Sequence, residues 1–128
     1  MSEPDLTTAA GRAAAEVAVA RAMFPPWQLA DDGIHWFRWH ADIESRSESQ
    51  EKRCECPAYL SDDPRLNREM WLALPRGRGE CWSHVDSIDY HEIGRTSEPL
   101  SWVSGATKAE ALVLALVAAG VVALPATS

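Results

Sequence analysis

Four side chains in two short segments are of the types that hold a zinc ion. Cys54 and Cys56 stand one residue apart in "CEC", and "CWSH" separates Cys81 from His84 by two residues. Structural zinc takes four thiolate or imidazole ligands, and a two-residue gap is a common spacing for one pair of them. The one-residue gap of "CEC" is less usual. These four residues therefore predict a zinc-stabilised binding module, with three reduced thiols and a surface histidine as the alternative.

Two histidine–aspartate pairs offer a second kind of chemistry. The segment "HAD" contains His40 and Asp42, and "HVD" contains His84 and Asp86. Residues at i and i+2 of a strand face the same side, so each pair places an imidazole beside a carboxylate. Two such pairs on neighbouring strands could form a metal-dependent acid–base site. Because no nucleophile elbow, phosphate loop or helical metal motif accompanies them, solvent-facing positions are the simpler explanation and we expect no enzyme activity.

Six tryptophans are many for a chain of 128 residues, and exposed tryptophans are enriched in protein interfaces. Most of them are expected to fill the edges of a small core. Trp36 stands among polar neighbours, and Trp71 lies at the edge of an apolar helical stripe. These two are the tryptophans that we expect at an interface.

Three segments have the pattern of helices. Residues 7–23 are rich in alanine and open with Thr7 and Thr8, either of which can cap the helix, and residues 63–74 open with an Asp-Pro pair that suits a helix start. Residues 107–119 open with a capping box of Thr107 and Glu110. The last of these helices is apolar on all sides, which predicts that it is buried.

Strands are expected between the helices. In residues 34–43, Phe37 and Trp39 alternate with polar residues and should face the core, whereas residues 44–56 should form a polar exposed loop. Residues 80–93 predict one strand or a bent pair of short strands, and residues 100–104 predict a further short strand.

The expected order is therefore α-β-α-β-β-α in a single domain spanning residues 1–128. Residues 121–128 should pack on the sheet or fray. This order predicts the α+β class, with a small antiparallel sheet covered by helices.

Composition limits the functions that fit the chain. Nineteen acidic residues against twelve basic ones give a formal net charge of −7, which argues against direct binding of nucleic acid and favours a partner with a basic surface. The start of the sequence lacks the charge and apolar pattern of a signal peptide, and the apolar run 111–124 is shorter than the roughly 20 residues that cross a bilayer. We expect an intracellular protein with no membrane segment. Its oligomeric state stays open.

Three blocks together resemble the phage ABA sandwich domain, a family of small phage and prophage proteins. The blocks are "GRAAAEVAVARAM", "PAYLSDDPRLNREMWLAL" and "ATKAEALVLALVAAG". The matching positions are Gly11, Arg12, Met23 and Trp27 in the first block, Pro57, Tyr59, Ser61 and Asp62 in the second, and Trp82 with the helix 109–119 in the third. The polar segment 44–56, with its cysteines, departs from the family pattern.

The resemblance implies a role without catalysis. The matching positions are capping and packing residues, and no catalytic residue or cofactor can be transferred. The implied protein is a phage or prophage accessory protein in the cytoplasm of a bacterial host that binds a host or phage protein. One version is an inhibitor of a bacterial defence complex whose acidic residues mimic a nucleic-acid backbone.

Overall fold

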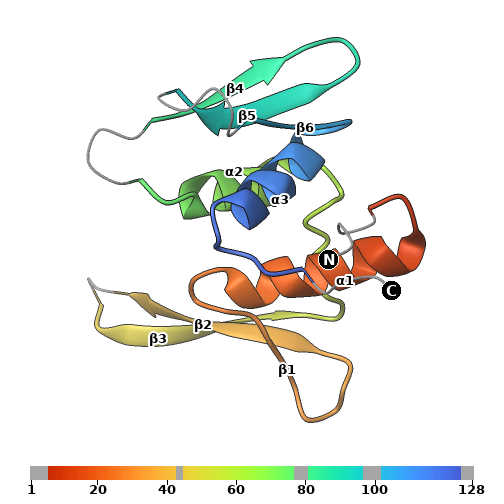
Figure 1. The fold of residues 1–128 in the computed structure, drawn as a ribbon. Coiled ribbons are helices and arrows are strands. Elements are labelled where there is room, and N and C mark those ends of the chain that lie inside the picture. The colour runs from red at the N-terminus through yellow and green to blue at the C-terminus, as the bar shows by residue number, and fades with distance from the viewer. Residues whose placement is uncertain (1–5, 43–44, 77–80, 97–101, 125–128) are drawn as a thin grey trace.

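The computed structural model describes residues 6–42, 45–76, 81–96 and 102–124, which form three helices and two antiparallel sheets (Figure 1). The helices are α1 (Ala9–Ala22), α2 (Pro64–Ala73) and α3 (Lys108–Ala118). The first sheet contains β1 (Gln28–Leu29), β2 (Trp36–Asp42) and β3 (Ser47–Arg53), and the second contains β4 (Trp82–Asp86), β5 (His91–Arg95) and β6 (Val103–Gly105). The predicted α+β class is confirmed, and the predicted order of elements is roughly correct.

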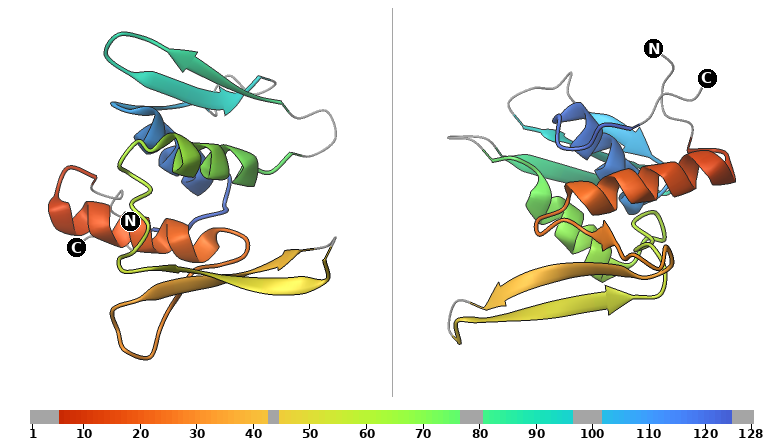
Figure 2. Two further views of the ribbon diagram at one scale, coloured as in Figure 1. Left: turned by 180° about the vertical axis from the view of Figure 1, so that it is seen from behind. Right: turned by 90° about the horizontal axis from the view of Figure 1, so that it is seen from below.

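The helices lie between the two sheets (Figures 1 and 2). Helices α2 and α3 lie against β4–β6, and α1 lies on the side of β1–β3. One apolar cluster fills this middle layer and includes buried side chains from all three helices and both sheets. Because the apolar helix α3 occupies the centre of this layer, its predicted burial is confirmed.

The predicted helix starts are also found. Asp63 accepts a hydrogen bond from the backbone N–H of Arg65 at 2.8 Å, and Thr107 accepts one from the N–H of Glu110 at 3.1 Å. Thr8 caps α1 in the same way. Each cap satisfies a backbone donor that has no partner inside the helix.

The segment 44–56 was predicted to be a loop, which is wrong for most of its length. Residues Ser47–Arg53 form β3, which pairs with β2 from Trp36 opposite Arg53 to Asp42 opposite Ser47. The expected exposure of this segment is found, since β3 is an edge strand with mostly exposed side chains. An edge strand whose side chains are exposed to solvent does not need alternating apolar and polar residues. The sequence of β3 therefore lacks the alternation by which strands are usually predicted.

The predicted facing of β2 is inverted. Trp36 is only 7% exposed and Arg38 is also buried, whereas Trp39 is 47% exposed. The inversion has a physical reason, because the buried arginine is paired with Glu69 and stacks on Trp27. A buried charge of this kind is tolerated only when it is paired and hydrogen-bonded.

The single expected sheet is in fact two sheets. The segment 80–93, for which one strand or a bent pair of short strands was expected, contains β4 and the start of β5, which pair as an antiparallel hairpin. After α3, the chain packs back on the core, where Val122 is buried and its N–H donates to the carbonyl oxygen of Leu116 at 3.3 Å. The predicted tail therefore packs as far as Leu124, and its remainder lies outside the described residues.

Candidate functional site

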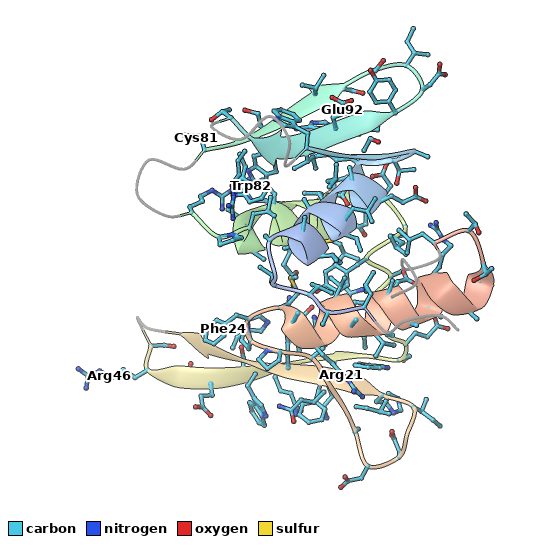
Figure 3. All side chains as sticks on the ribbon, viewed as in Figure 1. Arg21, Phe24, Arg46, Cys81, Trp82 and Glu92 are labelled. Carbon is cyan, nitrogen blue, oxygen red and sulfur yellow. The ribbon has the colours of Figure 1, made fainter. Side chains whose placement is uncertain are left out.

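The four predicted zinc ligands are distributed over both sheets. Cys54 and Cys56 follow β3 of the first sheet, whereas Cys81 precedes β4 of the second sheet, in which His84 lies (Figure 3). The part of the chain that the structure describes contains no group of three or more His, Cys, Asp or Glu side chains that could hold a metal ion. Burial, with the nearby charge of Glu16, raises the pKa of the Cys56 thiol to about 11. The zinc hypothesis stays a prediction.

The two histidine–aspartate pairs do not meet. His40 lies on β2 and its Nε2 is 2.8 Å from a carboxylate oxygen of Glu51, whereas His84 lies on β4 in the other sheet. His84 stacks on His91, with ring centroids 5.2 Å apart and Nε2 2.9 Å from Nδ1 of His91. Nδ1 of His91 is in turn 3.4 Å from the carboxylate of Asp86. The spacing in the sequence predicts that His84 and Asp86 share a side of the strand, but it does not indicate His91, which contacts both.

The two tryptophans predicted at an interface have different environments. Trp36 is buried, so this prediction is wrong for it, because its side of β2 faces the core. Trp71 is half-buried at the outer side of α2, and the guanidinium of Arg76 lies 5.7 Å from the centre of its ring. Trp71 remains accessible.

Trp71 and His84 line the same hollow, of about 500 Å³, between α2, the start of α3 and β4. The lining residues are Asp62, Pro64, Asn67, Arg68, Trp71, His84 and Lys108. The local sequence positions them, because the capped start of α2 places Asn67, Arg68 and Trp71 within one and a half turns. Lys108 is the first residue of α3.

Asp62 joins the two helices at the floor of this hollow. Its Oδ1 accepts hydrogen bonds from Nδ2 of Asn67 at 2.8 Å and from the backbone N–H of Ala109 at 3.1 Å. The backbone of Asp62 has a φ of 62°, a left-handed conformation that aspartate tolerates better than most residues. Asp62 therefore caps α3 from a distant part of the chain.

The charges around the hollow are mainly positive. Among the described residues Arg68 and Lys108 form no ion pair with a carboxylate, and they approach the hollow from different helices. Burial, the charge of Lys108 and the neighbouring His91 lower the pKa of His84, against the opposing effect of Asp86. A lowered pKa favours the neutral imidazole, so the positive charge comes from Arg68 and Lys108, against the one lining carboxylate of Asp62. The hollow can therefore attract an anion, although the whole chain is acidic.

The β4–β5 hairpin presents a second, different surface. The backbone N–H of Ser87 donates to the carbonyl oxygen of Tyr90 at 2.9 Å, which leaves Ile88 and Asp89 at the tip. Ile88 is 100% exposed, and Val85 and Tyr90 are also exposed. In Figures 1 and 2 this tip stands clear of the helices. The hairpin therefore exposes three apolar side chains that have acidic neighbours in the sequence.

A buried polar network that sequence reasoning missed lies on the side of the first sheet. Arg38 donates to both carboxylate oxygens of Glu69, at 2.5 and 3.1 Å, and to Glu51 at 3.2 Å. Its guanidinium lies 4.4 Å from the centre of the Trp27 ring. The hydroxyl of Tyr59 donates to Glu69 at 2.7 Å, and burial together with this hydrogen bond raises the pKa of Tyr59.

The network has a structural role, because it ties β2 and β3 to α2. Burial alone would lower the pKa of Arg38, but hydrogen bonding and attraction to Glu69 and Glu51 outweigh it and raise that pKa. No sequence signal could have found this arrangement, since its partners come from separate segments.

Comparison of the sequence with protein-family models, curated proteins and solved structures finds no match. None of the described helices is long and apolar enough to span a lipid bilayer.

Proposed function

We propose that this protein is a non-enzymatic phage or prophage accessory protein that binds another protein in the cytoplasm of a bacterial host. The exposed tip of the β4–β5 hairpin carries the proposal. The resemblance to the phage domain supports the phage origin and the binding role. An inhibitor of a bacterial defence complex is one form of such a protein.

The chemistry of the hairpin defines the partner. Residues 82–93 contain Asp86, Asp89 and Glu92 but no lysine or arginine. Glu92 lies on β5 in the sheet that carries the tip (Figure 3). Three exposed apolar side chains beside these carboxylates fit a basic groove with an apolar floor, because the apolar groups supply affinity and the charges supply orientation and association rate. The net charge of −7 extends the same complementarity to the whole molecule.

The test uses the substitution Ile88→Ser in a capture experiment from bacterial host lysate, followed by affinity measurement with the purified partner. A partner that uses the hairpin binds the wild-type protein and loses at least about tenfold in affinity with Ile88→Ser. The control is Ile34→Ser, since Ile34 is also exposed but lies in the turn between β1 and β2.

A captured protein supports the proposal only if Ile88→Ser weakens its binding and Ile34→Ser does not. Equal loss with Ile34→Ser, or full retention with Ile88→Ser, would contradict docking through the hairpin. Binding through the carboxylates also predicts that Asp89→Asn lowers the association rate and reduces its dependence on salt.

A further inference from the structure

We infer that the hollow between α2, the start of α3 and β4 binds a small anion that carries a planar ring, of the class of nucleoside monophosphates. This site lies apart from the hairpin tip, and the inference goes beyond the proposed protein-binding function. It rests on the size, the charges and the aromatic wall of the hollow, and on the unsatisfied amide oxygen of Asn67, one of its lining residues.

The size of the hollow suits a small ligand. Its volume of about 500 Å³ lies within the range of pockets that bind compact organic molecules. Its walls come from three elements that are distant in the sequence, and Asp62 holds two of them together through hydrogen bonds to Asn67 and to the N–H of Ala109. The walls are therefore positioned before a ligand arrives.

The charges select an anion. Arg68 and Lys108 line the hollow and have no acidic partner within the described ranges, although the chain carries an excess of acidic residues. An arginine offers a planar pair of donors and a lysine a compact charge, and both are common ligands of phosphate. His84 adds an imidazole from a third element, β4.

The remaining walls select more than a bare phosphate. Trp71 offers an aromatic surface on which a flat ring can stack, an interaction that proteins use widely for nucleobases. Asn67 is only 7% exposed, and among the described residues its Oδ1 finds no hydrogen-bond donor, whereas its Nδ2 donates to Asp62. A buried acceptor without a donor is costly. Because this oxygen is itself buried, a ligand amino or hydroxyl group can satisfy it only if the side chain of Asn67 turns toward the hollow.

The test is calorimetric titration of the whole chain with AMP, GMP, CMP and UMP, and in parallel with adenosine and inorganic phosphate. At least one monophosphate should bind with a Kd below about 1 mM, and both adenosine and inorganic phosphate should bind at least about tenfold more weakly. Equal binding of inorganic phosphate would show an unspecific anion site and overturn the inference. Absence of heat with every monophosphate at about 5 mM would overturn it as well.

Variants decide whether the hollow is the site. Arg68→Gln and Lys108→Gln should each weaken the monophosphate at least about fivefold, because each removes one phosphate contact. Arg65→Gln is the matched control, since Arg65 is an exposed arginine of the same helix that does not line the hollow. An equal loss of affinity with Arg65→Gln would show that the affinity depends only on the net charge of the protein, which would contradict a site in the hollow.

The failure of this inference is separable from that of the proposed function. Ile88→Ser should leave monophosphate binding unchanged, and Arg68→Gln should leave binding of a hairpin partner unchanged. Circular dichroism of each variant verifies that the fold is retained. If Arg68→Gln is unfolded, Lys108→Gln supplies the same measurement from another helix.

Discussion

Arg38 links the first sheet to α2 through its contacts with Glu51, Glu69 and Trp27. It is buried on the inner side of β2, where two carboxylates and the ring of Trp27 surround its guanidinium. Removing one partner of such an arrangement leaves the others desolvated without compensation, which costs more than the intact arrangement contributes.

We therefore predict that Arg38→Met lowers the free energy of unfolding by about 2–4 kcal/mol, at the lower end because Glu51 and Glu69 keep some contact with solvent. Urea denaturation followed by circular dichroism measures this change. Arg65→Met is the control and should change the free energy by less than about 0.5 kcal/mol, because Arg65 is exposed and forms no ion pair with any other described residue. Similar losses in both variants would show that the network does not stabilise the fold.

His84 makes stability depend on pH at a single residue. Its pKa is lowered in the folded protein by burial, by Lys108 and by His91. At pH values between the two pKa values of His84, the unfolded chain binds more protons than the folded protein. The contribution of His84 to stability is therefore fully present above the unfolded pKa of roughly 6.5 and is lost as the pH falls through the folded pKa.

We expect the Tm of the wild-type protein to fall as the pH is lowered from about 7.5 to about 5. In His84→Gln this fall should be smaller than in the wild-type protein by a few degrees. Thermal unfolding at a series of pH values tests this. Ser83→Ala is the control, because Ser83 is the neighbour of His84 on β4 and its replacement removes no titratable group. An unchanged slope in His84→Gln would contradict the assignment.

At the scale of elements, β5 depends on one glycine. A Cβ atom on Gly94 would lie 2.5 Å from Cγ of Trp102, so the tryptophan ring occupies the space that any side chain would need. The ring of Trp102 thereby lies directly over β5 at this position, which leaves room for glycine alone.

Gly94→Ala should therefore lower the free energy of unfolding by about 1–3 kcal/mol, the usual range for inserting a methyl group into a packed site. Ser83→Ala, opposite Gly94 on β4, should have an effect below about 0.5 kcal/mol. In a Trp102→Leu background the cost of Gly94→Ala should shrink, because the smaller side chain can move. An equal cost in both backgrounds would place the strain elsewhere.

For the whole molecule, we predict that the fold is independent of metal. The apolar cluster connects both sheets through the helices, and a core of this extent needs no metal ion in a chain of this length. The thiolate is the form that binds zinc, and burial raises the pKa of the Cys56 thiol to about 11, which makes its thiolate costlier to form.

EDTA should therefore leave the Tm unchanged, and protein purified without chelator should contain less than about 0.2 zinc per chain. Elemental analysis and thermal unfolding measure these two quantities. A stoichiometric zinc content with a lower Tm after EDTA would instead support the zinc-stabilised module of Cys54, Cys56, Cys81 and His84.

Local interactions could be predicted well from the sequence. Asp63 and Pro64 indicated the start of α2, and Thr107 with Glu110 indicated the start of α3, because capping involves residues a few positions apart. The same holds for the α+β class, since the three helical patterns and the apolar strands are local features.

Distant interactions could not be predicted. The strand character of β3 depends on β2 beside it, and the burial of Arg38 depends on Glu69, 31 residues away. The hollow is formed by His84, Arg68 and Lys108 from three separate elements, so no spacing in the sequence indicates it. The sequence alone determined where helices begin and what class of fold they build, because those preferences act over one or two turns. Only the tertiary structure decided which polar residues are buried and which charges share a site, because contacts between distant segments set both.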